Sequence, residues 1–274
     1  MVNGLLFRVD QHLHSSALRT HVQKPWIRAT TMDEETLPLF VLPMVLFPGE
    51  VQELRVFEPR YRQMLDTCIL DERPFGLVLN DSFAPANGWD GPRRHGCEAE
   101  IVHHETRGVH HFITITGGRR FFIDEVIEPA LPPFSDPSMA ELVSDEGMPP
   151  DVHTLMEQVP ADHPNPSLYI SGKVTYLKEE GVLDEATQNY LRDIVRKVVA
   201  RAGENMSINE TMLSEWIESI CEENVTDSVQ SIYNIATLCL DGLEARQQLL
   251  ASSTVDEMMN EFNEHLPAFI LEWE

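Results

Sequence analysis

The chain has 274 residues, and its 45 acidic and 20 basic side chains give a formal net charge of −25. So acidic a balance excludes a general electrostatic attraction to nucleic acid or to an anionic membrane surface. No apolar run approaches the ~20 residues that a membrane-spanning helix needs. The length allows a sizeable buried core and one or two domains.

The four cysteines, Cys68, Cys97, Cys221 and Cys239, are scattered through apolar contexts without a Cys-x-x-Cys pair. This distribution is typical of buried, reduced thiols in a cytoplasmic protein. The first residues lack the basic region and apolar core of a secretory signal. We therefore predict a cytoplasmic location, with no disulfide.

Residues 1–36 show no organised pattern, and we predict a loosely ordered N-terminal extension. The stretch Asp10-Gln11-His12-Leu13-His14 has the form of a metal motif. An alternation of two histidines is common by chance, however, and no other ligand pattern accompanies it. The sequence therefore predicts no metal site in this extension.

The segment Leu37–Tyr61 combines two apolar runs with a turn and a helix start. Its first run is short and flanked by proline, which favours a strand. Pro48-Gly49 predicts a turn, after which an extended, partly buried run follows. Glu58-Pro59 predicts the start of a helix over about 59–70, because the fixed φ of proline suits the first turn.

Further strands are predicted at Phe75–Leu79, Gly96–Val102, Phe112–Ile123 and Leu168–Leu177. Within the third of these, Gly117-Gly118 lies between two alternating runs and predicts a hairpin turn. Residues 129–166 hold nine of the 18 prolines. We expect this insertion to be a surface loop with a short helical turn near Val152–Gln158.

Beyond Asp184 the apolar residues recur at helical spacing, and five helices are expected. The first ends at Gly203, and Ser207 or Asn209 caps the second. The apolar face of this second helix is formed by Met212, Leu213, Trp216, Ile217 and Ile220. The third ends at Asp241-Gly242, and the remaining two span Leu243–Leu250 and Val255–Glu272, the last with a Thr254/Glu257 capping box.

Several of these motifs, in this order, resemble the N-terminal domain of the ATP-dependent Lon proteases, which also occurs as a stand-alone protein. The resemblance rests on Pro48, Gly49, Phe57, Glu58, Pro59, Arg60 and Tyr61, and on a Gly-x-x-Arg-Phe pattern at Gly117, Arg120 and Phe121. It implies an α+β fold. A PUA-like antiparallel β pseudobarrel with one helix would occupy 37–178, with the insertion 129–166, and a C-terminal helical bundle would occupy 184–274. We interpret the motif residues as fold-defining.

The resemblance implies a non-catalytic module that recognises unfolded or partly folded polypeptides, linked to protein quality control. The alternative is an adaptor with one folded partner. The only Gly-Lys pair, Gly172-Lys173, lacks the upstream glycine of a P-loop, and no length remains for a Ser–Lys peptidase. We therefore expect no enzyme activity and no cofactor.

Peptide-contact candidates are Phe83 and Trp89 in a predicted loop, Asn80–Arg94, because large apolar groups are hard to bury in such a loop. The alternative is that both side chains pack over one end of the barrel. Basic residues are dense only at Arg93-Arg94 and Arg119-Arg120. Phosphate binding needs several clustered cations, so nucleic acid is not an expected partner.

A competing hypothesis rests on His103, His104, His110 and His111, which flank a predicted turn at Glu105–Gly108. Two strands joined there would place the two pairs opposite each other, close enough for two imidazoles to share zinc. Adjacent residues face opposite sides of a sheet, so each face would hold only two histidines. We expect solvent-exposed strand residues and no metal, with a metal-dependent enzyme as the alternative.

Overall fold

The computed structural model describes residues 35–144, 149–178, 181–206, 209–267 and 270. The predicted extension, with His12 and His14, lies outside these residues except for Glu35 and Thr36, which belong to the first strand. The elements in chain order are β1 (Glu35–Leu42), β2 (Val51–Val56), α1 (Pro59–Leu70), β3 (Phe75–Ala86), β4 (Trp89–Arg107), β5 (His110–Ile127), η1 (Pro137–Leu142), α2 (Val152–Gln158), β6 (Ser171–Tyr176), α3 (Glu185–Met206), α4 (Glu210–Asn224), α5 (Gln230–Cys239), α6 (Leu243–Ala251) and α7 (Val255–Glu264).

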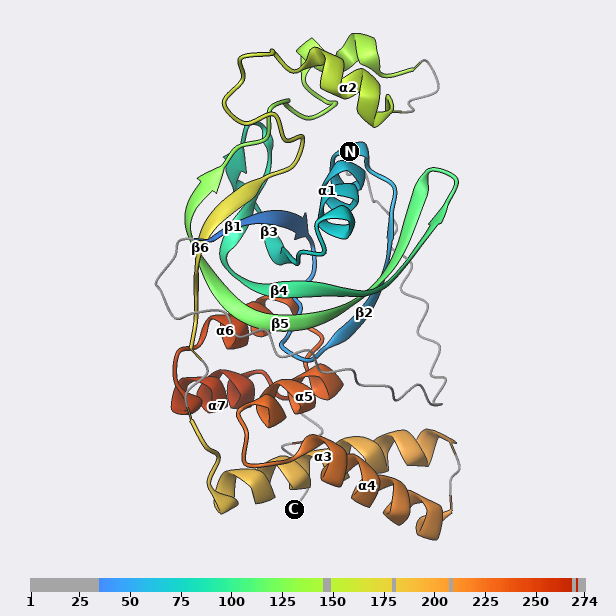
Figure 1. The fold of residues 1–274 in the computed structure, drawn as a ribbon. Coiled ribbons are helices and arrows are strands. Elements are labelled where there is room, and N and C mark those ends of the chain that lie inside the picture. The colour runs from blue at the N-terminus through green and yellow to red at the C-terminus, as the bar shows by residue number, and fades with distance from the viewer. Residues whose placement is uncertain (1–34, 145–148, 179–180, 207–208, 268–269, 271–274) are drawn as a thin grey trace. The chain divides into compact units, whose positions relative to one another are not determined.

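The six strands form one curved sheet in the order β2-β5-β4-β3-β1-β6 (Figure 1). Strand β6 also pairs with β5, so five strands close into a ring and β2 is attached to β5 outside it. The α+β class is confirmed. The sheet is not antiparallel throughout, because β1 and β3 run parallel, with Leu39 opposite Gly76. The PUA-like character stays a prediction.

Helix α1 has the predicted bounds and lies against the concave side of the sheet (Figure 1). Pro59 occupies its first turn, where a missing N–H costs nothing. Tyr61, Met64, Leu65 and Cys68 are buried at helical spacing, as expected. The Tyr61 hydroxyl donates to the Val41 carbonyl at 2.8 Å, and burial raises the pKa of this phenol. The helix is thus held against β1.

The hairpin predicted at Gly117-Gly118 is wrong, since both glycines lie inside the single strand β5. The chain reverses instead at Gly108-Val109, between β4 and β5, where Gly108 has φ +60°. Gly117 has another role: a Cβ there would come within 2.0 Å of the Phe47 carbonyl oxygen. Its N–H donates to the Glu50 carbonyl at 2.9 Å. The glycine therefore allows the loop before β2 to cross β5 closely.

The proline-rich insertion differs from the predicted surface loop, because it has a small core of its own. Met139 and Leu155 of the insertion are buried together with Leu168, which follows it, and partly buried apolar side chains surround them. Helix α2 has the predicted bounds, whereas the 3₁₀ helix η1 was not expected. The insertion thus adds a packed layer beside α1, where the Gln63 amide donates to the Met156 sulfur at 2.9 Å.

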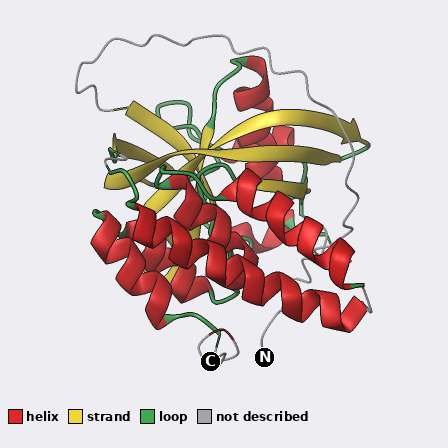
Figure 2. Ribbon diagram, turned by 90° about the horizontal axis from the view of Figure 1, so that it is seen from below, coloured by secondary structure: helices red, strands yellow, loops and turns green. Residues whose placement is uncertain are grey.

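The C-terminal helices lie on one side of the sheet (Figure 2). The largest hydrophobic cluster contains side chains from both the sheet and the helices, among them Phe47, Ile115, Tyr233 and Leu249. The predicted domain boundary between residues 178 and 184 stays a prediction. None of the helices in the described ranges has the length and hydropathy to cross a membrane.

Two predicted helix ends are wrong. Helix α3 does not end at Gly203 but continues to Met206. Gly203 lies instead where α3 and α4 cross closely, since a Cβ there would lie 2.5 Å from the Leu213 side chain of α4. Helix α7 ends at Glu264, ahead of Pro267, which disfavours helical backbone in the residue before it. Asn209 caps α4, and the Thr254/Glu257 capping box is confirmed.

Candidate functional site

The family-motif residue Arg120 joins the sheet to the helices. Its side chain is 2% exposed, and its guanidinium donates to the carbonyl oxygens of Leu250 at 2.9 Å and Ser252 at 2.6 Å. Those carbonyls lie at the C-terminal end of α6, where a helix leaves acceptors without intrahelical partners. Strand β5 and the end of α6 are thereby bound together through a buried cation.

A second buried contact lies beside the first, between Arg246 of α6 and Glu50. The two form an ion pair whose side chains are 11% and 5% exposed. Glu50 also accepts the Phe47 N–H at 2.9 Å, and Arg246 donates to the Val45 carbonyl at 3.1 Å. Polar groups of the loop before β2 are therefore satisfied by α6. We call the contacts of Arg120, Glu50 and Arg246 the junction.

The Pro48-Gly49 turn is part of the same arrangement. Gln230 of α5 donates to the Pro48 carbonyl at 2.6 Å, and Gly49 adopts φ +74°, which favours glycine. A Cβ on Gly49 would come within 2.7 Å of the Gln230 amide. The two motif residues of this turn therefore pack closely against α5, and the junction is a packed interface where the motif residues meet the helices.

Trp89 is not in a loop, because β3 and β4 form a hairpin that turns at Asn87-Gly88. Its indole N–H donates to the Leu131 carbonyl at 2.9 Å, and its ring meets Phe134 edge-on. The Arg60 guanidinium lies 3.6 Å over the indole and 4.2 Å over Tyr61. Trp89 thus packs against the insertion and the Arg60 side chain, and its role in binding peptides stays a prediction.

Phe83 is 98% exposed. The register between β3 and β4 shifts between Asp81 and Ala86, so residues 82–85 form a wide bulge that carries Phe83 into solvent. Asp81 accepts the Phe83 N–H at 3.0 Å, and Gly91 lets the bulge approach β4, since a Cβ there would lie 1.8 Å from the Ala84 oxygen. Bulges commonly redirect side chains at binding sites. The binding role of Phe83 stays a prediction.

The histidines do not form the predicted cross-strand pairs. Because the turn is at Gly108-Val109, His103 and His104 face Thr114 and Ile113, while His110 and His111 face Arg107 and Thr106. His103 and His104 are exposed, as expected. His111 is instead buried, 3.3 Å from Asp66 of α1, and burial lowers its pKa. In the described part of the chain, no three His, Cys, Asp or Glu side chains gather closely enough to hold a metal ion.

The arginines of the two basic stretches are engaged within the protein. Arg93 pairs with Asp81 and Glu244, and Arg94 donates to the Ile123 carbonyl. Arg119 makes two contacts with Glu98, both at 3.0 Å, while Arg120 is buried in the junction. These side chains therefore do not present the free cationic surface that phosphate binding needs.

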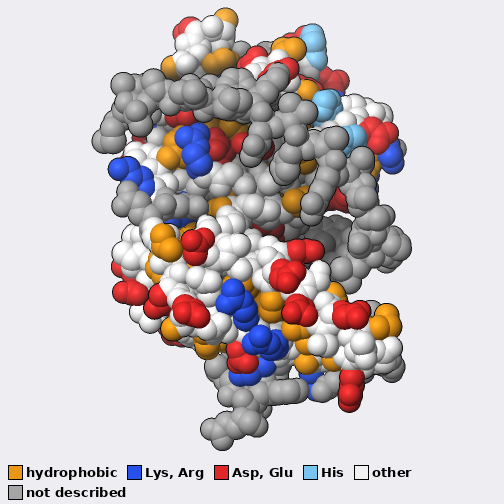
Figure 3. All heavy atoms as spheres, turned by 60° about the horizontal axis from the view of Figure 1, so that its bottom comes forward, with side chains coloured by type: hydrophobic (Ala, Val, Ile, Leu, Met, Phe, Trp, Pro, Cys, Tyr) orange, Lys and Arg blue, Asp and Glu red, His pale blue; other side chains and the backbone are white. Residues whose placement is uncertain are grey.

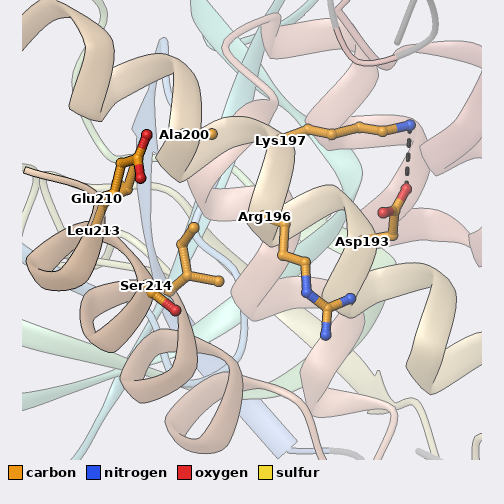
Figure 4. Close-up of a pocket in the computed structure, with 8 residues that line it drawn as sticks. Asp193, Arg196, Lys197, Ala200, Glu210, Leu213 and Ser214 are labelled. Carbon is orange, nitrogen blue, oxygen red and sulfur yellow. Dashed lines mark ion pairs between the residues drawn. The ribbon is translucent and has the colours of Figure 1, made fainter. Parts of the chain in front are cut away.

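A groove of about 560 Å³ runs between α3 and α4 (Figure 4). It is lined by Asp193, Arg196, Lys197, Ala200, Glu210, Leu213, Ser214 and Ile217. Lys197 pairs with Asp193 at 3.1 Å, whereas Arg196 has no carboxylate within ion-pair distance among the described residues. The groove thus combines apolar side chains with an unpaired guanidinium, which suits an amphipathic ligand such as a polypeptide segment.

Helix α4 leaves part of its apolar face exposed. Cys221 is its only described buried residue, whereas Met212 is 59% and Trp216 36% exposed. Figure 3 shows this end of the protein, where hydrophobic side chains lie among acidic and basic ones. The sequence placed Met212 and Trp216 on one apolar face with Leu213, Ile217 and Ile220, since periodicity identifies a shared face without showing what covers it. No sequence signal separated them from the buried positions.

These observations define a class of protein: a β-ring with a helical layer, held by a buried polar junction, which exposes apolar side chains on α4 and on a strand bulge. A family model described as the ATP-dependent protease La (LON) substrate-binding domain matches residues 36–267. The chain belongs to this family. Comparison with curated proteins gives no match.

Two solved structures show the same fold. One is the crystal structure of a Lon N-terminal domain protein from Xanthomonas campestris, with 18% identity, a TM-score of 0.50, and coverage of 85% of this chain and 99% of that one. The other is the N-terminal domain of a Mycobacterium avium complex Lon protease, with 13% identity, a TM-score of 0.51, and coverage of 88% and 100%.

Proposed function

We propose that this protein is a non-catalytic module that binds unfolded or partly folded polypeptides, in the setting of protein quality control. The observation that carries the proposal is the match to a substrate-binding domain over most of the chain. The four cysteines are buried, which fits a reducing compartment such as the cytoplasm.

The exposed apolar side chains supply a physical means of binding polypeptides. Phe83, Met212 and Trp216 are large apolar side chains in contact with solvent, and the α3–α4 groove lies beside the last two. Unfolded segments differ from native proteins in exposing apolar side chains of this size. Methionine and groove surfaces tolerate varied partners, because the flexible thioether adapts its shape. We therefore assign the side-chain contacts to α4, its groove and Phe83.

A binding titration tests this function. The probe is one fluorescently labelled protein in two forms: native with its disulfides, and reduced and carboxymethylated so that it stays unfolded. We expect saturable anisotropy changes with the unfolded form and none with the native form. Equal binding of the two forms, or no binding of the unfolded one, would contradict the proposal.

An adaptor with one folded partner is the competing function. Co-purification from cells followed by mass spectrometry separates the two, since a recognition module retains many unrelated proteins at low occupancy. An adaptor retains one protein in a fixed ratio. The second result, together with a failed titration, would replace the proposed function.

A further inference from the structure

Strand β2 is paired along one side only. The ring gives each of its strands neighbours on both sides over part of its length, whereas β2 pairs with β5 alone, from Val51 opposite Thr116 to Val56 opposite His111. Among the described residues, no backbone hydrogen bond reaches the other side of β2 from another element. Within the described part of the chain, the outer side of β2 is thus a free sheet edge.

The register identifies which backbone groups point outward. The Gly117 N–H donates to the Glu50 carbonyl, so Glu50 and Gly117 form a hydrogen-bonded pair in the register that continues through β2. Such pairs alternate with pairs that are not hydrogen-bonded in an antiparallel ladder. Gln52, Leu54 and Val56 therefore bond to β5. The N–H and C=O groups of Val51, Glu53 and Arg55 point away from it.

We propose that this edge binds an extended stretch of the client polypeptide as an added β-strand. The inference rests on the proposed function and gives it a binding mode. Backbone donors and acceptors that recur at every second residue, about 7 Å apart, match another extended backbone and no compact ligand. Since backbone groups are common to all sequences, this edge would accept clients that share no sequence motif.

The side chains of β2 support the same occupant. Natural free edges are commonly protected by proline, by a bulge or by charged side chains, especially lysine. Val51–Val56 contains no proline, lysine or bulge, and its charged side chains are Glu53 and Arg55. The outward charges, Glu53 and Arg55, have opposite signs, so they do not repel clients of one charge. The exposed Val51, 59% accessible, offers an apolar contact to an alternating client strand.

A second open edge, on β4, fits less well. Among the described residues, β4 has no partner on its outer side beyond Ala99, but a register shift between Ile101 and His103 interrupts its alternation. Residues 102–109 are exposed on both faces, so a strand added there would bury little apolar surface. In β2, by contrast, Val56 is buried and Leu54 packs against the core, which fixes the strand for pairing.

The test compares Glu53→Pro with Glu53→Ala. Proline removes an outward N–H and leaves the bonds of Gln52 and Leu54 to β5 in place, whereas alanine removes the side chain alone. The probe is a labelled peptide of alternating threonine and valine with lysine ends, long enough to pair with all six β2 residues. We expect Glu53→Pro to weaken binding about tenfold and Glu53→Ala to change it by less than about twofold.

Near-ultraviolet circular dichroism and thermal unfolding check that both variants fold. If Glu53→Pro does not fold, wild-type protein is titrated with the same peptide N-methylated at alternate residues. Methylation along one edge should abolish binding, and methylation along the other should not. Equal affinity of both variants, or of all peptides, overturns strand addition while leaving the proposed function intact. Failure of wild type to bind the unfolded protein probe overturns the function itself.

Discussion

The junction and the α3–α4 pair contact solvent in opposite ways, although C-terminal helices contribute to both. In the junction, Arg120, Arg246 and Glu50 are buried and bonded to one another or to backbone carbonyls. In the α3–α4 pair, Trp216 and Met212 are exposed, and Arg196 lines a groove without a carboxylate partner among the described residues. Under the proposed function, the junction would supply stability and α4 would supply binding surface.

The largest expected effect comes from breaking the buried pair in the junction. Arg246→Ala should lower the free energy of unfolding by about 3–5 kcal/mol, because it leaves Glu50 charged and buried without its partner. Urea unfolding followed by circular dichroism measures the change. The double variant Glu50→Gln/Arg246→Met should lose less than Arg246→Ala alone. A larger loss of unfolding free energy in the double variant would show that the Glu50–Arg246 pair does not stabilise the junction in this way.

Gly117→Ala tests the close crossing beneath the junction. The added methyl group would overlap the Phe47 carbonyl, so we expect a loss of about 1–3 kcal/mol in unfolding free energy. Gly242→Ala is the matched control, since its Cβ would meet only the Ala245 side chain at 3.6 Å. Equal losses in the two variants would mean that the crossing is not tight.

A smaller effect on stability is expected when the pH is lowered. Burial lowers the pKa of His111, and burial followed by the neighbouring Arg120 lowers that of His95. The unfolded chain protonates these rings as pH falls through about 6.5, while the folded protein keeps them neutral, so stability is lost as pH falls from there to the lowered pKa values. Asp66 and Thr106 contact the His111 ring, while Arg62 and His104 act on it electrostatically.

His111→Gln isolates this contribution. Wild type and variant are unfolded thermally at pH about 7.5 and about 5.5, on either side of the ordinary histidine pKa. The variant should lose less stability on acidification than wild type. An equal loss would mean that His111 takes up its proton in the folded protein as readily as in the unfolded chain.

The smallest effect on stability, with the clearest effect on binding, is expected at α4. Met212→Ser should change the unfolding free energy by less than about 1 kcal/mol, since Met212 is 59% exposed. It should weaken binding of the unfolded probe several-fold. Leu70→Ser on α1, 84% exposed, is the control and should bind like wild type. Matching affinities of the two variants would remove α4 from the binding surface.

Local sequence patterns predicted the fold where one signal determined the structure. Pro59 and the buried Tyr61, Met64 and Leu65 defined α1 to the residue, as did the capping box at Thr254 for the start of α7. The glycines were ambiguous, because glycine permits both turns and close approaches. In the sequence, Gly117 looks like a turn and Gly203 like a helix end. In the structure, Gly117 leaves room for the Phe47 backbone and Gly203 for the Leu213 side chain.

The candidate sites were less predictable, because they depend on which faces stay uncovered. Periodicity placed Trp216 and Ile217 on one apolar face but could not show that Ile217 packs against the core while Trp216 stays partly exposed. Phe83 was expected to be exposed through a loop and is exposed through a strand bulge. The free edge of β2 follows only from ring closure by β5 and β6, which is a long-range pairing that no local pattern specifies.

Hydrogen exchange measured by mass spectrometry, with and without the reduced and carboxymethylated probe, tests the central comparison most directly. Binding should slow exchange in peptides that cover β2 and α4, including the outward amides of Val51, Glu53 and Arg55. Peptides that cover Arg120 and residues 246–252 of the junction should be unchanged. Protection confined to the junction, or absent throughout while the probe is bound, would contradict the account.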